Sequence, residues 1–204
     1  MKHKTLWALA LTSFSFVLSN CMYRTAENQA SDSPTTTLSS AELVKRGEYL
    51  VNAVGCDDCH TPKTMTAEGP VPDASRRFMG HPAEEPFESS DAMTKLIGDT
   101  HVGIFSAGFT ASAGDWGVSY AANLTPDDTG IGTWTEAQFI KAIREGKSKG
   151  MDGTRPLLPP MPWPVYRNFN DDDLKAIFAY LQSVPPIKNA VPNPKPLAAD
   201  LTAK

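Results

Sequence analysis

The sequence predicts one mainly helical domain, over residues 39–188, with a long irregular region in its middle. Ser39 with Glu42, and Thr135 with Gln138, each have the spacing of a capping box, in which two side chains close the first turn of a helix. Three aspartates after Asn170 predict a further helix, because carboxylates suit the positive end of the helix dipole.

The first of these helices runs from Ser39 to the glycine at position 55. Its apolar residues recur at helical spacing, at Leu43, Leu50, Val51 and Val54. Gly47 lies in mid-helix, where glycine costs about 1 kcal/mol relative to alanine. We therefore expect close packing at this position.

The middle region is expected to be mostly loop over residues 61–90, which are rich in Pro, Gly and acidic residues. A short helix is predicted around Ala92–Ile97. The runs HVGIFSAGF (101–109) and WGVSYAANL (116–124) resemble strands, and we expect them to pair as a small β-hairpin.

The second and third capped helices have clear ends. Trp134 and Phe139 stand at the positions of a hydrophobic staple around Thr135, and Gly146 is a plausible stop. The prolines in RPLLPPMPWPVY (155–166) exclude a helix there. The last helix has an apolar face formed by Leu174, Ile177, Phe178, Leu181 and Val184.

The N-terminus predicts export. A basic start precedes an apolar run of about 15 residues, too short for a membrane span, and residues 1–20 are therefore interpreted as a signal peptide. Leu18 precedes Cys21 as in a bacterial lipobox, which predicts lipidation of Cys21. The alternatives are an uncleaved anchor or another cleavage site. Residues 21–38 would form a flexible tether, and residues 189–204 form a Pro-rich tail. The expected location is the periplasm or cell surface, with anchoring through Cys21.

The charge balance argues against nucleic acid as a partner. The formal net charge is −4, and loss of residues 1–20 removes two lysines and no acidic residue. A phosphate-binding surface needs an excess of Lys and Arg. The acidic pairs Asp57-Asp58, Glu84-Glu85 and Asp127-Asp128 are interpreted as solvated surface.

The motif Cys56-x-x-Cys59-His60 is the attachment signature of c-type haem. Two thiols three positions apart on a helical turn can reach the two vinyl groups of one porphyrin. The next residue, His60, then lies where it can bind the iron.

Other interpretations of this motif have less support in the sequence. A tetrahedral zinc site needs four ligands, and His81 and His101 lack a recognisable spacing to the cysteine pair. A redox dithiol would call for a βαβ pattern nearby, yet a helix leads into the motif. A structural disulfide between Cys56 and Cys59 is the remaining alternative.

A ligand on the opposite side of the iron is expected from a methionine or histidine. Met161 is preferred because the prolines on both sides of it would hold its thioether at a fixed height. Met151 and His101 are the alternatives. The other methionines of the domain are interpreted as packing.

From Ser39 to Pro186 the order of these features resembles the class I cytochrome c family. The segments NLTPDDTGIGTWTEAQF and LLPPMPW are similar to the cytochrome subunits of periplasmic alcohol and sugar-acid dehydrogenases. Those subunits usually carry three haems, whereas this sequence has one CxxCH motif. The resemblance implies a cytochrome c fold, with helices around one covalently bound haem c.

The resemblance also implies roles for single residues. Cys56 and Cys59 would form the thioether bonds, and His60 and Met161 would be the axial ligands. It further suggests that the Pro70 carbonyl accepts a hydrogen bond from His60. Asn123, Trp134 and Arg155 are candidates for contacting the haem propionates, although Trp134 could be only a staple, Asn123 only a turn residue and Arg155 an ordinary surface residue.

The function predicted in this way is one-electron transfer between protein partners, a dehydrogenase or an oxidase, without a small-molecule substrate of its own. One alternative is a haem enzyme whose sixth iron position is open to peroxide or a small gas. Another is a dedicated electron-accepting subunit of a dehydrogenase complex. A zinc-binding structural module is the most distant.

Overall fold

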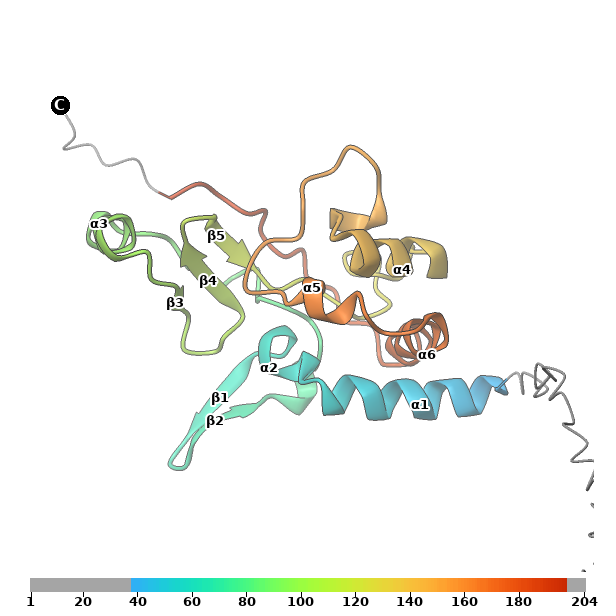
Figure 1. Ribbon diagram of the computed structural model, residues 1–204. Coiled ribbons are helices and arrows are strands. Elements are labelled where there is room, and N and C mark those ends of the chain that lie inside the picture. The colour runs from blue at the N-terminus through green and yellow to red at the C-terminus, as the bar shows by residue number, and fades with distance from the viewer. Residues whose placement is uncertain (1–37, 198–204) are drawn as a thin grey trace, which may run out of the picture. The chain divides into compact units, whose positions relative to one another are not determined.

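The computed structural model describes residues 38–197 (Figure 1). This part of the chain contains helices and two small antiparallel sheets. The helices are α1 (Ser40–Ala53), α2 (Cys56–His60), α3 (Asp91–Thr100), α4 (Glu136–Glu145), α5 (Trp163–Tyr166) and α6 (Asp171–Leu181). The strands are β1 (Lys63–Thr66), β2 (Gly69–Pro72), β3 (Ile104–Phe105), β4 (Ala111–Gly114) and β5 (Gly117–Tyr120).

Helices α1 and α6 form the most extensive contact between elements in this part of the chain. They meet at Gly47, where a Cβ atom would lie 1.9 Å from the carbonyl oxygen of Ala176. The close packing expected at Gly47 is thus confirmed. The capping box of Ser39 and Glu42 is also present, so α1 begins where the sequence predicts.

The main hydrophobic core lies among α1, α4 and α6. Its buried members include Val51 from α1, Phe139 from α4, and Leu174 and Leu181 from α6. Trp134 packs against the same core, in agreement with the predicted staple. Helix α4 begins with the predicted capping box and ends at Gly146, whose φ of 64° lies in the left-handed region.

A β-hairpin follows the CxxCH motif, where the sequence predicted loop. β1 pairs antiparallel with β2, and Met65 lies opposite Pro70. The sequence did not predict β2 because its prolines disfavour a strand. They are tolerated because both strands of a two-stranded sheet are edges, where an N–H can be absent without breaking a ladder.

The second sheet has the order β3-β4-β5. The two runs predicted to pair with each other contribute β3 and β5, so that prediction is wrong in its pairing. The strand between them, β4, has the sequence ASAG, and its small residues are all buried. The ring of Trp116 covers Gly114 so closely that a Cβ there would lie 2.3 Å from it.

Two other helices differ from the prediction. Helix α3 is longer than the expected Ala92–Ile97 and begins at the N-cap Ser90. Within the proline-rich run, Trp163–Tyr166 forms one helical turn, α5, with Pro164 near its start. Proline is compatible with the first helical turn because the N–H groups there have no partner within the helix.

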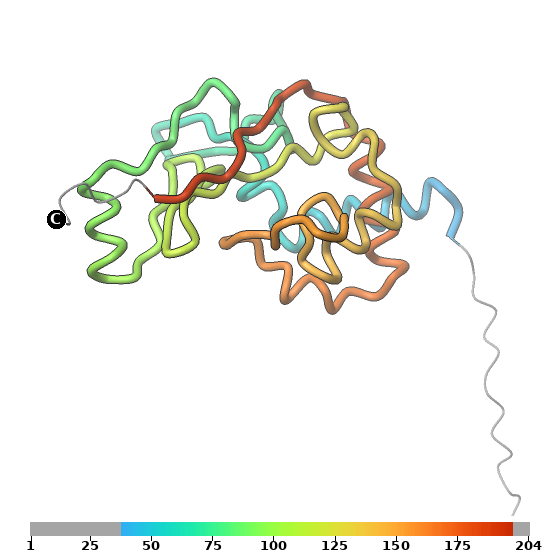
Figure 2. Tube along the Cα trace, turned by 90° about the horizontal axis from the view of Figure 1, so that it is seen from above, coloured from blue at the N-terminus to red at the C-terminus, as the bar shows by residue number. Residues whose placement is uncertain are grey.

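The segment after α6 returns along the domain to the second sheet. Figure 2 shows it, in red, crossing beside the green and yellow segments. Lys195 pairs antiparallel with Val118 of β5. The buried Asn189 side chain donates to the carbonyl oxygens of Met79 and His81, at 2.6 and 2.9 Å.

We expect Asn189→Ala to destabilise the domain by about 1–3 kcal/mol, because buried carbonyl groups would lose their donor. The amide oxygen of Asn189 also accepts from the N–H of Ala83 at 3.0 Å, which adds to the loss. Asn168→Ala is the matched control, because that exposed side chain bonds only within its own turn. Chemical denaturation of both variants tests this expectation, and equal stabilities would contradict it.

The sequence predictions for the two ends of the chain fall on residues that the structure does not describe. The signal peptide at residues 1–20, the lipidated Cys21, the tether up to residue 37 and the tail from residue 198 lie outside the described residues. Between residues 38 and 197, no helix is both long enough and apolar enough to cross a membrane.

Candidate functional site: the CxxCH helix and its surroundings

The motif itself forms helix α2, which follows α1 after a sharp change of direction at Gly55. Gly55 has a φ of 73°, a left-handed conformation that glycine adopts without steric cost. Cys56, Cys59 and His60 therefore project from a single helical turn. Lys63 closes the end of α2, since its ammonium group donates to the carbonyl oxygens of Asp57, Asp58 and Thr61.

The His60 ring is buried and oriented by one hydrogen bond. Its Nδ1 lies 2.7 Å from the carbonyl oxygen of Ala122. Because a carbonyl oxygen only accepts, Nδ1 carries the proton and the lone pair of Nε2 stays available. No residue within 38–197 hydrogen-bonds to Nε2. Burial lowers the pKa of His60, while the Ala122 carbonyl and the charge of Asp57 oppose this effect.

The expected acceptor, Pro70, is not the partner of His60. Pro70 lies exposed in β2, opposite Met65. Residues 121–123, which follow β5, pass beside α2 and supply the acceptor instead. The N–H of His81 donates to the carbonyl of Ala121, and the N–H of Gly80 donates to that of His60. These two hydrogen bonds hold residues 121–123 in place next to the motif.

The two thiols are partly buried and do not form a disulfide. Burial raises the pKa of the Cys56 thiol to about 12, and the charge of Asp57 adds to this rise. The pKa of Cys59 is also raised by burial. A redox dithiol needs a lowered thiol pKa to react as thiolate. The environment of this pair is therefore opposite to that of a redox-active dithiol.

The segment that carries Met161, residues 157–162, is here called the Met strap. Two hydrogen bonds position it: Leu157 N–H donates to the Gly146 carbonyl, and Ser119 Oγ donates to the Pro159 carbonyl, both at 2.6 Å. The Met161 side chain is partly buried and borders the main core, as does Cys56.

The Met strap leads into α5, which contacts the backbone just before the CxxCH motif. The hydroxyl of Tyr166 donates to the carbonyl of Val54 at 3.0 Å, two residues before Cys56. Burial raises the pKa of Tyr166 to about 12, and the nearby Cys56 and Cys59 add to the rise. Two chain segments that are 112 residues apart in the sequence thus meet at this place.

The alternative ligands lie in different surroundings. Met151 is half exposed, at 49%. His101 is exposed and pairs with Asp115 at 3.0 Å. His81 is buried, but Thr110 and the Glu85 carbonyl occupy its two ring nitrogens. Neither histidine joins the cysteine pair, which removes the additional ligands considered for zinc.

Of the three residues considered for propionate contacts, Asn123 and Trp134 are engaged within the domain, whereas Arg155 has no acidic partner among the described residues. Asn123 is buried and fully used: it accepts from Thr125 and donates to the Ile187 carbonyl. These bonds agree with the alternative role of Asn123 as a turn residue, and its contact with a propionate stays a prediction. Trp134 packs on the core as the staple of α4. Arg155 has no carboxylate partner among residues 38–197, and burial lowers its pKa.

Sequence reasoning missed the role of Asp57. It was interpreted as solvated, yet its partly buried carboxylate receives the guanidinium group of Arg77 in a two-pronged contact. An ion pair between positions 20 residues apart leaves no local pattern in the sequence. Only the charge of the RR dipeptide at positions 76–77 could have suggested a partner for an acidic motif.

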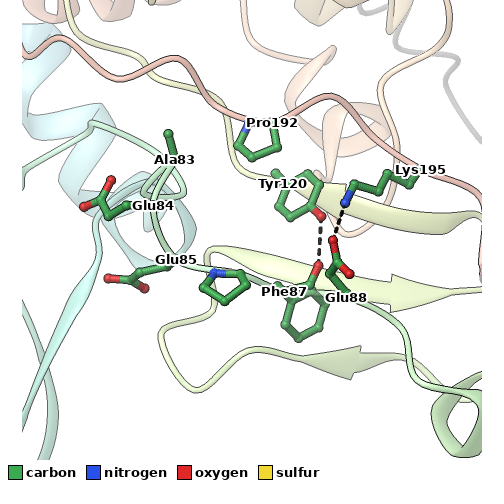
Figure 3. Close-up of a pocket in the computed structure, with 9 residues that line it drawn as sticks. Ala83, Glu84, Glu85, Phe87, Glu88, Tyr120, Pro192 and Lys195 are labelled. Atoms are coloured by element: carbon green, nitrogen blue, oxygen red, sulfur yellow. Dashed lines mark hydrogen bonds and ion pairs between the residues drawn. The ribbon is translucent and has the colours of Figure 1, made fainter.

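A shallow pocket lies elsewhere on the domain, between the acidic loop at residues 83–88 and the C-terminal segment (Figure 3). Tyr120 donates to the Phe87 carbonyl there, and Lys195 pairs with Glu88. No residue of the CxxCH motif and no part of the Met strap lines it. This pocket is therefore distinct from the candidate site.

The donor set at α2 fits haem. Two thiols without a disulfide, an imidazole whose Nε2 has no partner in the described part of the chain, and a partly buried thioether on a fixed strap are the groups that a covalently attached, six-coordinate haem requires. A comparison with family models gives the decisive observation, since the cytochrome c model matches residues 44–185. The chain belongs to the cytochrome c family. Membership implies haem c bound covalently, and the CxxCH helix is where this cytochrome would hold it.

Several curated relatives of this cytochrome are named as subunits of dehydrogenases. It is 32% identical over 189 residues to the gluconate 2-dehydrogenase cytochrome c subunit of Pantoea cypripedii, covering 92% of this chain and 30% of that protein. It is 30% identical over 164 residues to the fructose dehydrogenase cytochrome subunit of Gluconobacter japonicus, covering 79% and 25%. It is 29% identical over 147 residues to the cytochrome c subunit of the quinone-type alcohol dehydrogenase of Gluconobacter oxydans, covering 71% and 22%. The chain therefore spans less than a third of each of these relatives.

Proposed function

We propose that this cytochrome is a one-electron carrier with a single haem c, joined through Cys56 and Cys59 and ligated by His60 and Met161. The observation that carries the proposal is that α5, which directly follows the Met strap, is hydrogen-bonded to the backbone just before the motif. Cys56 and Met161 border the same core, and Tyr166 of α5 bonds to the backbone next to the motif. The haem would supply the chemistry, the gain and loss of one electron.

The residues of the chain hold and shield that group. The Ala122 carbonyl keeps the proton on Nδ1 of His60, which leaves Nε2 as the donor atom. Such a partner fixes the ring and increases its basicity toward iron. The anchors at Ser119 and Gly146 limit the motion of the Met strap. The guanidinium group of Arg155, which has no carboxylate partner among the described residues, would pair with a haem propionate.

The proposed electron donor is a dehydrogenase, as the printed names of the relatives suggest. In this arrangement the partner oxidises the substrate, and this cytochrome passes the electrons on one at a time. A role as a dedicated subunit of such a complex is the closest alternative, and co-purification with a dehydrogenase would distinguish it from a free carrier.

We also propose that the protein is exported and held at a membrane by lipid on Cys21. This proposal is based on the basic start, the short apolar run and the Leu18-to-Cys21 spacing of the sequence. Labelling with a radioactive fatty acid tests it: label in the parent protein and none in Cys21→Ala is the expected result. Equal labelling of both would contradict it.

The test of the function is an optical spectrum of the protein matured with a cytochrome c assembly system. We expect a red protein with a sharp reduced α band, whose haem stays with the chain after denaturation. One haem per chain by mass is the expected stoichiometry. A colourless product would overturn the proposal. A high-spin spectrum would replace the carrier by the alternative, a haem enzyme with an open iron position.

A further inference from the structure

Asp57 lies inside the CxxCH motif, and its carboxylate is almost fully engaged. The guanidinium group of Arg77 meets both of its oxygens, with N–O distances of 2.5 and 3.0 Å. The Thr61 hydroxyl donates to the same carboxylate at 2.7 Å. Such two-pronged contacts between arginine and a carboxylate are the strongest of the charged hydrogen bonds.

Arg77 extends this contact to the two long helices. Its guanidinium group donates to the Tyr180 hydroxyl of α6 at 2.8 Å and to the Asn52 side chain of α1 at 2.6 Å. It also stacks over the ring of Phe78, 4.4 Å from its centre. One arginine therefore connects the motif to the α1–α6 pair.

Asp57 lies where its charge can affect the residues that would bind the haem. It directly follows Cys56 and precedes His60 by one helical turn, so it is close to both of these haem-binding residues. The carboxylate is only 22% exposed, and charges that are partly buried are screened less than exposed ones. Its charge therefore acts at short range on the residues that would hold the haem.

A negative charge at this place favours the oxidised haem, which carries one positive charge more than the reduced form. Arg77 supplies a compensating positive charge at hydrogen-bond distance. We propose that the Asp57–Arg77 ion pair sets the reduction potential of this cytochrome, with Arg77 as a positioning residue that neutralises the carboxylate inside the haem-binding motif. This inference rests on the proposed haem at Cys56, Cys59 and His60.

The test is a redox titration of the haem-loaded protein and two single variants. Asp57→Asn leaves the arginine unpaired, so its midpoint potential should rise. Arg77→Gln leaves the carboxylate unpaired, so its midpoint should fall. We expect each shift to approach a tenfold change in the ratio of oxidised to reduced protein, which is about 59 mV for one electron. The double variant should return toward the parent.

The opposite signs separate an electrostatic role from a structural one. If the ion pair acted only by holding α2 in place, both single variants would loosen the site and shift the midpoint in the same direction. Arg76→Gln is the matched control: it removes the same charge one residue earlier, but Arg76 pairs with Asp73 and Glu85, away from the motif. Its shift should be clearly smaller.

Arg77→Lys covers the case in which Arg77→Gln fails to mature. It keeps the charge and loses the two-pronged contact, so its midpoint should stay near that of the parent while Asp57→Asn still rises. Shifts of equal sign in Asp57→Asn and Arg77→Gln, a shift in Arg77→Lys as large as that in Asp57→Asn, or no shift in Asp57→Asn would overturn this inference alone if the parent is red. A parent protein without haem would overturn the proposed function and this inference together.

Discussion

Gly47→Ala is expected to destabilise the domain by at least about 2 kcal/mol. In a free helix the same change would be favourable by about 1 kcal/mol. Here the new Cβ would lie 1.9 Å from the carbonyl oxygen of Ala176 and 2.7 Å from Cβ of Tyr180. Backbone atoms of a neighbouring helix cannot rotate away, so α1 and α6 would have to separate along their main contact.

The separation of α1 from α6 should also disturb the CxxCH motif. Helix α1 runs directly into α2, and both Asn52 of α1 and Tyr180 of α6 contact Arg77, the partner of Asp57. We therefore expect a lower yield of haem-loaded protein in addition to the lower stability. Chemical denaturation and the ratio of haem absorbance to protein absorbance measure the two effects.

A second helical glycine provides the control. Gly98 lies in α3, and a Cβ there would meet nothing within 4 Å. Gly98→Ala should therefore stabilise the domain by up to about 1 kcal/mol, the helix-propensity gain alone. If Gly47→Ala behaved like Gly98→Ala, the close crossing of α1 and α6 would not exist in solution.

The features that the sequence predicted correctly are local. Both capping boxes and the left-handed stop at Gly146 depend on residues within one or two turns of each other, and all three are present. The close packing at Gly47 was also predictable, because a glycine in mid-helix has a cost that close packing can offset. The motif was readable for the same reason, since its three groups lie on one turn.

The acceptor for His60 could not be read from the sequence. Every residue has a backbone carbonyl, so the identity of Ala122 carries no signal, and the two residues are 62 positions apart. Pro70 was a reasonable candidate from the resemblance. In this chain the residues around it form a hairpin with β1, which carries Pro70 to an exposed edge.

Strand β4 could not be predicted from the sequence for a different reason. Its sequence ASAG has neither β-branched nor aromatic residues, so it lacks the composition typical of strands. It is a strand because its neighbours β3 and β5 lie on both sides and the Trp116 ring leaves no room for a side chain at Gly114. Tertiary packing, and not local preference, decides the structure of this segment.

Met161→Ala is expected to abolish the weak far-red band of the oxidised protein that marks a sulfur–iron bond. The Met strap has little freedom to offer another ligand, because the Leu157 N–H and the Pro159 carbonyl are both bonded to other parts of the domain. We expect a high-spin component to appear and the midpoint potential to fall, since a thioether ligand raises the potential. Absorption spectra and a redox titration measure both effects.

Met151→Ala is the matched control for this change. Met151 precedes the Met strap by six residues and is 49% exposed, so its loss should leave the far-red band and the potential unchanged. Loss of the band in Met151→Ala, with retention in Met161→Ala, would move the ligand to Met151. Retention in both would exclude these two methionines and indicate another thioether of the chain as the ligand. A band absent already in the parent would instead favour His101, which would have to leave its pair with Asp115.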